Sequence, residues 1–148
     1  MHNHKSYFTK QVLTEVMKHY SWSENYQLET SYSNSVLIKF PKCTILMIEG
    51  FDSDMNAYFL NKDTGRGSTQ YSLSVLDAVG VIKGKCKLSK ADMVLLDGAV
   101  KFLDIEPSVN KVKQGINNIC ILLQVYLKPC IDGDFSWVIE YNMQNPNN

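Results

Sequence analysis

Four aspartates are the side chains with the clearest potential for chemistry in this chain. Asp52 and Asp54 flank a serine, and Asp132 and Asp134 flank a glycine. Paired carboxylates can carry out acid–base hydrolysis, and an aspartate pair with glycine is also found in calcium loops, although the full EF-hand loop is absent here. A small hydrolase or ligand-binding protein would need both pairs to converge on one pocket. We favour the simpler interpretation that aspartate is common in turns.

The other reactive residue types form no recognisable catalytic or metal site. His2 and His4 lie near the start of the chain and His19 falls near the end of a predicted helix, with no further ligand at zinc spacing. The glycines on either side of Arg66 lack the spacing of a phosphate loop. We therefore expect no catalytic residue, no metal and no cofactor, and a binding protein rather than an enzyme.

Composition is typical of a globular protein without a preference for anionic partners. The 148 residues predict a single domain, and the 15 basic and 15 acidic residues cancel. Arg66 is the only arginine, and arginine is the preferred residue for bidentate phosphate and base contacts. The lysine cluster Lys83, Lys85, Lys87 and Lys90 has no interleaved aromatic residue or arginine, so it indicates a solvated loop. We expect no nucleic-acid partner.

The sequence also predicts where the protein resides. Residues 1–5 have no apolar segment of a secretory signal, and the apolar runs are far shorter than the roughly 20 residues of a membrane span. The four cysteines form no C-x-x-C pair. We expect a cytoplasmic protein with reduced thiols and no membrane contact. The sequence makes no prediction about its oligomeric state.

The first half of the chain predicts one helix followed by an antiparallel sheet. Apolar residues at helical spacing predict a helix over residues 6–20. Four short segments then alternate or are apolar throughout, and turn residues separate them. These predicted strands cover residues 26–32, 36–40, 44–48 and 55–60. Connections this short join antiparallel neighbours, so we predict a four-stranded meander.

The second half predicts about three helices and a terminal segment. The helices begin at residue 71 or 72, at the capping sequence Ser89–Asp92, and at Val109, and the last one ends before Pro129. Alternation over residues 135–141 predicts a terminal strand or extended arm, with a helix as the alternative. The overall prediction is a single α+β domain, with helices covering one sheet face and frayed ends at about residues 1–5 and 142–148.

Two short stretches resemble small α+β bacterial proteins of toxin–immunity loci. One is the strand pair, the polar loop and then Tyr71-Ser72-Leu73-Ser74-Val75-Leu76. The other is Leu127-Lys128-Pro129 followed by Gly133-Asp134-Phe135-Ser136-Trp137. The resemblance covers about a third of the chain and identifies no single immunity family. It implies a cytoplasmic, non-catalytic inhibitor that binds a toxin protein.

The charge pattern predicts where such a partner would bind. Glu49, Asp52, Asp54 and Asp63 make the strand half locally acidic, and Arg66 lies in the following loop. Toxins that attack nucleic acid are commonly basic, and a surface rich in carboxylates can steer and hold a basic partner. We therefore predict that these five residues belong to the partner-binding face.

Overall fold

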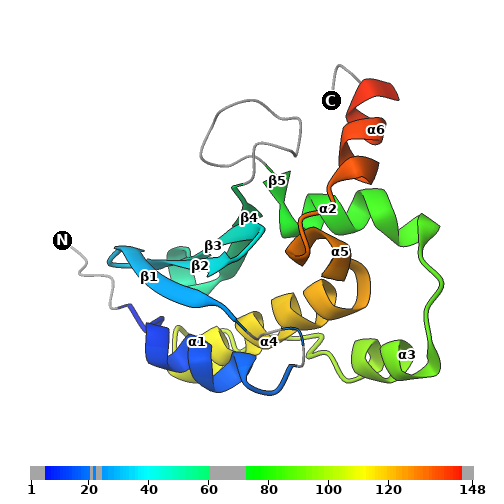
Figure 1. Ribbon diagram of the computed structural model, residues 1–148. Helices are drawn as coiled ribbons and strands as arrows, with labels where there is room; N and C mark the ends of the chain where they lie inside the picture. The colour runs from blue at the N-terminus through cyan, green and yellow to red at the C-terminus, as the bar shows by residue number, and fades with distance from the viewer. Residues whose placement is uncertain (1–5, 21, 23–24, 61–72, 145–148) are drawn as a thin grey trace.

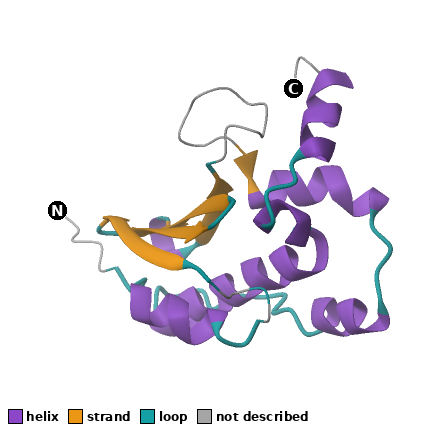
Figure 2. Ribbon diagram, in the orientation of Figure 1, coloured by secondary structure: helices purple, strands orange, loops and turns teal. Residues whose placement is uncertain are grey.

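The computed structural model describes residues 6–20, 22, 25–60 and 73–144 of the chain. Within these residues the protein has an antiparallel sheet and several helices, so the α+β prediction is confirmed. The helices and the sheet separate into layers, with α1 (Lys10–Met17) and α4 (Val109–Tyr126) below the sheet (Figure 1). Figure 2 shows the same arrangement by type of secondary structure.

The sheet has five strands in the order in which they occur along the chain. They are β1 (Gln27–Tyr32), β2 (Ser35–Phe40), β3 (Cys43–Glu49), β4 (Met55–Phe59) and β5 (Leu73–Ser74). Every neighbouring pair is antiparallel. The predicted four-strand meander was therefore one strand short. A strand of only two residues is too short to show an alternating pattern.

The strand register places one continuous apolar row against the helices. Ile38 of β2 pairs with Ile45 of β3, and Ile45 pairs in turn with Phe59 of β4. All three are fully buried, and they share a core with Leu13 of α1 and Ile116 of α4. Neighbouring positions on a strand point to opposite faces, so a one-residue slip would turn this row away from the helices.

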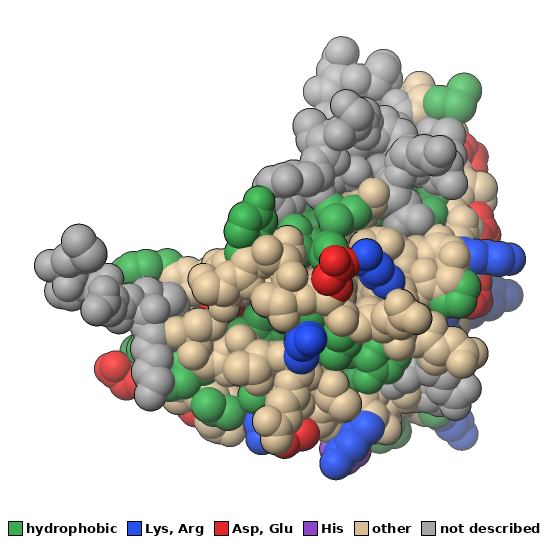
Figure 3. Space-filling view, turned by 60° about the vertical axis from the view of Figure 1, so that its left-hand side comes forward, with side chains coloured by type: hydrophobic (Ala, Val, Ile, Leu, Met, Phe, Trp, Pro, Cys, Tyr) green, Lys and Arg blue, Asp and Glu red, His purple; other side chains and the backbone are tan. Residues whose placement is uncertain are grey.

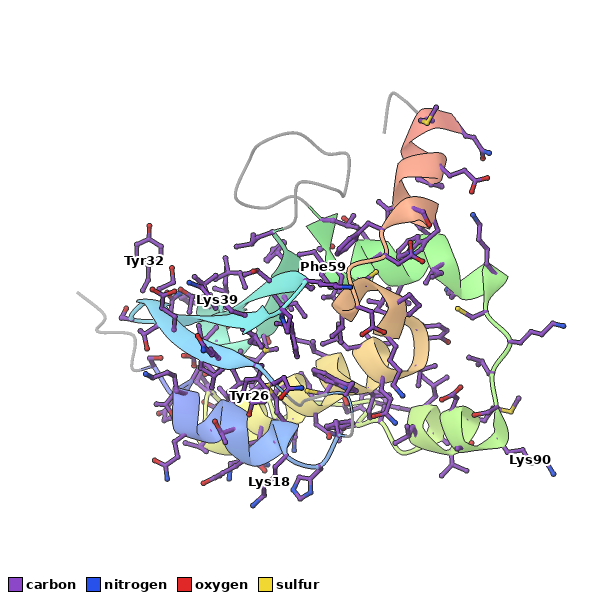
Figure 4. The ribbon with its side chains drawn as sticks, viewed as in Figure 1. Lys18, Tyr26, Tyr32, Lys39, Phe59 and Lys90 are labelled. Carbon is purple, nitrogen blue, oxygen red and sulfur yellow. The ribbon has the colours of Figure 1, made fainter. Side chains whose placement is uncertain are left out.

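The opposite sheet face is less completely covered. Leu37, Leu46 and Tyr58 pair across it, and the surface ion pair between Glu29 and Lys39 joins β1 to β2. Tyr32, at the end of β1, is 68% exposed and points away from the sheet (Figure 4). The side of the molecule that comes forward in Figure 3 carries few charged side chains among polar and hydrophobic ones.

The remaining helices follow β5. They are α2 (Val75–Ile82), α3 (Lys90–Asp97), α5 (Lys128–Ile131) and α6 (Ser136–Gln144). Two short 3-10 turns, η1 (Phe51–Ser53) and η3 (Lys83–Lys85), also occur. The predicted capping box is present, because the Ser89 and Asp92 side chains bond each other's backbone N–H at the start of α3. Several predicted helix ends were displaced, since α1 begins at residue 10 rather than 6, and α3 ends at residue 97, whereas the sequence predicted an end at about Leu103.

The prediction of a terminal strand was wrong, because residues 136–144 form α6. The Asp134 carboxylate accepts hydrogen bonds from the N–H of Ser136 (3.0 Å) and from its hydroxyl (2.6 Å), which favours a helix start. Phe135 and Val138 are buried three positions apart, a helical spacing. Phe135 meets Phe59 edge-on, with ring centroids 5.4 Å apart. Residues 142–144, where fraying was predicted, belong to α6, and residues 145–148 lie outside the described residues.

Gly115 sets how closely β4 approaches α4. A Cβ atom built on Gly115 would lie 2.9 Å from Cγ and 3.0 Å from Cβ of Met55. Gly80 of α2, by contrast, has nothing within 4 Å of such a position. Glycine is therefore required by packing at position 115 and not at position 80.

This contrast predicts opposite effects for the same substitution at two helical positions. Gly80→Ala should stabilise the fold by up to about 1 kcal/mol, because alanine is the better helix former. Gly115→Ala should destabilise it by roughly 1 kcal/mol, because overpacking against Met55 exceeds that helix gain. Urea unfolding of the two variants measures both changes. Equal stabilisation by both would show that Met55 moves aside freely.

Candidate functional site

The η1 turn presents Asp52 at the surface between β3 and β4. Asp52 and the next residue, Ser53, have φ angles of 60° and 61°, in the left-handed region. Aspartate is among the non-glycine residues that tolerate this region best. Three backbone hydrogen bonds close the turn, from Gly50 N to Asp54 O (2.7 Å), from Ser53 N to Gly50 O (3.2 Å) and from Asp54 N to Phe51 O (3.4 Å). Asp52 is exposed, and its role in binding a partner stays a prediction.

Glu49 does not lie on this surface, contrary to the predicted site. It is only 1% exposed and ends β3 on the core face. Its carboxylate accepts hydrogen bonds from the Ser6 hydroxyl (2.6 Å), the Tyr7 N–H (3.1 Å) and the Phe8 N–H (3.3 Å). The Ser53 hydroxyl donates a further bond at 2.8 Å. Glu49 therefore joins the segment before α1, the end of β3 and the η1 turn.

These hydrogen bonds keep Glu49 ionised inside the protein. Burial by itself raises the pKa of the carboxyl, but the donors from Ser6, Tyr7, Ser53 and Phe8 together outweigh burial and hold the pKa below its usual value. A carboxylate that accepts several hydrogen bonds is favoured in its charged form. Glu49 thus stabilises the turn that carries Asp52, although it does not itself face a partner.

Asp54 is already engaged by a lysine from the helix layer. The Lys111 ammonium lies 3.2 Å from the Asp54 carboxylate and 3.4 Å from the carbonyl oxygen of Ile105. Lys111 has a side chain only 7% exposed, whereas that of Asp54 is 63% exposed. One lysine in the first turn of α4 therefore holds the η1 turn and the loop before α4 together.

The loop between α3 and α4 carries side chains that the sequence prediction missed. Phe102 is 90% exposed and Ile105 is 87% exposed, and Phe51 in the η1 turn is 81% exposed. Large apolar side chains exposed to this degree in adjoining turns are a feature of interaction surfaces. In the sequence, these three side chains stand among turn residues and outside any helical or strand pattern, and this position could have indicated that they are exposed.

Hydrogen bonds to α4 fix this loop in place. The Asn118 side chain accepts from Val100 N (3.1 Å) and donates to Val100 O (2.8 Å). Gln114 accepts from Asp104 N at 3.1 Å, and Asn110 donates to the Asp104 carboxylate at 2.6 Å. The loop therefore presents its carboxylates and its apolar side chains from a defined backbone.

The two aspartate pairs do not converge. Asp52 and Asp54 follow the last residue of β3, whereas Gly133, between the other two aspartates, packs against Lys42 just before the first residue of β3. A strand of 7 residues spans roughly 20 Å. The single pocket required by the hydrolase interpretation is therefore not formed. Asp134 has its own local role, since hydrogen bonds from Ser136 lower the pKa of its carboxyl.

Asp63 and Arg66 were also predicted to bind a partner, and both lie outside the described residues. The lysine cluster at residues 83, 85, 87 and 90 is exposed around η3 and the start of α3. Figure 4 shows Lys90 at the far end of the molecule from the sheet. The cluster is thus separated from the acidic turn. That it forms a solvated loop without a nucleic-acid partner stays a prediction.

Thiol and metal chemistry receive no support from the described residues. Burial raises the pKa of Cys43, Cys120 and Cys130 to about 12, so these thiols are protonated at neutral pH and are poor nucleophiles. Among residues 6–20, 22, 25–60 and 73–144, no group of three or more histidine, cysteine, aspartate or glutamate side chains could hold a metal ion.

A groove lies beside the acidic turn, between β4 and α4. It has a volume of about 310 Å³, and Met55 and Ala57 of β4 line one wall. Ile119 and Leu122 of α4 line the other, and Leu103 of the α3–α4 loop also borders it. The volume is at the lower end of ligand pockets, which span roughly 300–1,000 Å³. Its lining is mainly apolar, which suits side-chain binding better than acid–base catalysis.

The role of Glu49 predicts a stability change that depends on pH. Glu49→Gln should lower the free energy of unfolding at neutral pH by roughly 2–4 kcal/mol, because an amide group would face hydrogen-bond donors. The folded-state pKa of Glu49 lies below the ordinary value that the carboxyl has in the unfolded chain. The contribution of the carboxylate is therefore present above that ordinary value and is lost as the pH falls through the folded-state pKa.

Denaturant unfolding between neutral and acidic pH checks this expectation. The difference between wild type and Glu49→Gln should shrink as the solution is acidified. Glu29→Gln is the matched control, because that carboxylate pairs with Lys39 at the surface, with a side chain 56% exposed, and such pairs contribute about 0–1 kcal/mol. Equal effects of the two substitutions would contradict the assigned role of Glu49.

The pair formed by Asp54 and Lys111 predicts an asymmetric double-mutant cycle. Asp54→Asn should cost about 1–2 kcal/mol, because it leaves the nearly buried ammonium of Lys111 without its carboxylate. Lys111→Met should cost less, since water can solvate the exposed Asp54 and methionine retains the apolar stem. In the double variant the cost of Asp54→Asn should disappear. A cost that is unchanged without Lys111 would rule out the coupling.

Comparison with known proteins adds no family to these observations. No protein-family model, curated protein or solved structure matches the chain. None of the helices in the described part of the chain is long and apolar enough to cross a bilayer.

Proposed function

We propose that the protein is a non-catalytic binding module that holds a protein partner on the surface formed by the η1 turn and the α3–α4 loop. The observation that carries this proposal is the exposure of Phe51 and Ile105 beside carboxylates, on turns joined through Lys111. Aromatic and large aliphatic anchors with a charged rim are the usual composition of a binding hot spot.

The charge of this surface favours a basic partner. Asp52, Asp104 and Glu106 are exposed on the two turns. Lys111 is the cation between these turns, and it is paired with Asp54, while Lys101 lies exposed in the loop. Carboxylates arranged in this way speed association with a positively charged surface and set its orientation.

An inhibitor of the immunity type is the specific form of this proposal. It is supported by the sequence resemblance to toxin–immunity proteins and by an acidic, apolar surface suited to a basic toxin. A surface held by hydrogen bonds needs little ordering on binding, which lowers the cost of association. The partner expected under this proposal is a toxin encoded by a neighbouring gene.

Binding to the product of the adjacent gene tests the proposal. The two proteins should co-purify after co-expression, and Phe51→Ser combined with Asp52→Asn should weaken binding by about 10- to 100-fold. Asparagine is chosen at position 52 because it also tolerates the left-handed conformation. The association rate of wild type should fall steeply with added salt.

The matched control is Val94→Ser combined with Asp97→Asn on α3. Val94 is 70% exposed and Asp97 is exposed one turn later, so the control removes a similar apolar and acidic pair away from the η1 turn. The control should bind as wild type does. Equal affinity of the η1 variant and wild type, with circular dichroism showing an intact fold, would place the interface elsewhere.

A further inference from the structure

The groove between β4 and α4 is a recess with a closed floor. Ala57 of β4 lines it and is only 4% exposed, so it lies at the floor. Met55 of β4 lies so close to Gly115 of α4 that a Cβ atom on Gly115 would be 2.9 Å from its Cγ. The start of α2 closes a further side, because residues 75–77 also line the groove. This recess is therefore bounded by β4, α2 and α4.

The size of the recess suits a single large side chain. Its volume is about 310 Å³, and a protein cavity of about 150 Å³ holds one benzene molecule. The walls favour an aliphatic chain, because Leu103, Ile119 and Leu122 all line them. Leu103 and Leu122 are half-buried, so a side chain that enters the recess would remove more of their apolar surface from water, which is favourable.

Asp77 gives the recess a negative charge at its rim. It is exposed, and it is the only charged side chain among the described residues that line the recess. Its backbone N–H donates to the Ser74 hydroxyl at 3.0 Å, but within the described part of the chain its carboxylate has no ion pair. The Asn118 amide, which also lines the recess, is already bonded to the backbone of Val100. A cation in the recess would therefore pair with Asp77.

The recess adjoins both parts of the surface proposed to bind the partner. Met55, on one wall, comes directly after Asp54 at the end of the η1 turn. Leu103, on another wall, lies in the α3–α4 loop and also borders the hollow formed by Ile105 and its neighbours. Lys111 joins the two segments through the Asp54 carboxylate and the carbonyl oxygen of Ile105. A partner seated on these turns would therefore lie next to the recess.

We propose that the recess receives one long basic side chain of the protein partner, an arginine or a lysine. The aliphatic stem packs against Leu103 and Leu122, and the cation pairs with Asp77. This inference rests on the proposed function as a protein-binding module and specifies the type of residue that anchors the partner. Charge complementarity favours this occupant, since an aromatic side chain would make no use of Asp77 and an acidic one would be repelled by it.

Butylguanidinium, which reproduces the stem and the head group of arginine, is the probe. Its titration should shift the methyl NMR signals of Leu103 and Leu122 in a saturable way, with weak binding because the probe is small. Butylurea has the same shape without the charge and should bind about 3- to 5-fold more weakly. Methylguanidinium keeps the charge without the stem and should bind about tenfold more weakly. No saturable shift with butylguanidinium, or equal binding of all three compounds, would overturn the proposal.

Two charge variants test the role of Asp77. Asp77→Asn should weaken butylguanidinium binding about 3- to 5-fold and leave butylurea binding unchanged. Asp97→Asn removes an exposed carboxylate of α3 that does not line the recess, so it should leave the binding of both compounds unchanged. Amide NMR spectra of both variants check that the fold is intact. Equal weakening of butylguanidinium binding by the two variants would overturn the pairing with Asp77.

Binding of the adjacent gene product separates this inference from the proposed function. Leu103→Ser combined with Asp77→Asn should weaken that binding by about tenfold, whereas Val94→Ser combined with Asp97→Asn is the matched control and should leave it unchanged. If the partner binds through the η1 turn but is unaffected by the recess variant, only the inference about the recess falls. If no partner binds while butylguanidinium does, the proposed function falls, and with it the partner as the source of the basic side chain.

Discussion

The buried carboxylate of Glu49 is the interaction on which the candidate surface depends. An ionised group with 1% exposure is costly unless hydrogen bonds replace its water. Here donors from Ser6, Tyr7, Phe8 and Ser53 supply those bonds. Because they come from the segment before α1 and from η1, the same charge fixes both to the end of β3. The hydrogen bond from the Ser53 hydroxyl to Glu49 also holds the turn in which Asp52 and Ser53 have left-handed backbone angles.

The proposed binding surface follows from that constraint and from one cation, Lys111. With the η1 turn fixed, Asp54 is positioned to meet Lys111 of α4, and Lys111 also contacts the loop through Ile105 O. Side-chain bonds from Asn118 and Gln114 hold the rest of the loop. Exposed apolar residues and carboxylates are therefore presented on fixed backbone, beside a groove. The proposed binding function rests on this arrangement.

Local patterns in the sequence predicted the α+β class and most elements, because β2, β3, β4 and α4 bury several of the apolar positions that form these patterns. The terminal strand was predicted wrongly because large apolar residues alternate over residues 135–141. The hydrogen bonds from Ser136 to Asp134 and the contact of Phe135 with Phe59 favour a helix instead. The short β5 had no pattern to detect. It forms because the chain passes the edge of β4 before α2 begins.

The candidate site was less predictable than the fold. The exposure of Asp52 and Asp54 could be predicted because acidic residues in a turn are exposed in most folds. Glu49 was misplaced because its neighbours in space, Ser6 and Tyr7, are more than 40 positions away in sequence. The pairing of Lys111 and the groove depend on how β4 meets α4, which no local pattern encodes.

The most direct test of this account is an NMR titration of the Glu49 side-chain carboxyl in the folded protein. The account predicts a single titration with a midpoint below the ordinary value for a glutamate side chain. The amide signals of Tyr7 and Phe8 should shift with the same midpoint, since both N–H groups donate to this carboxylate. A midpoint at or above the ordinary value, or Tyr7 and Phe8 amides that do not respond, would contradict the central role given to Glu49.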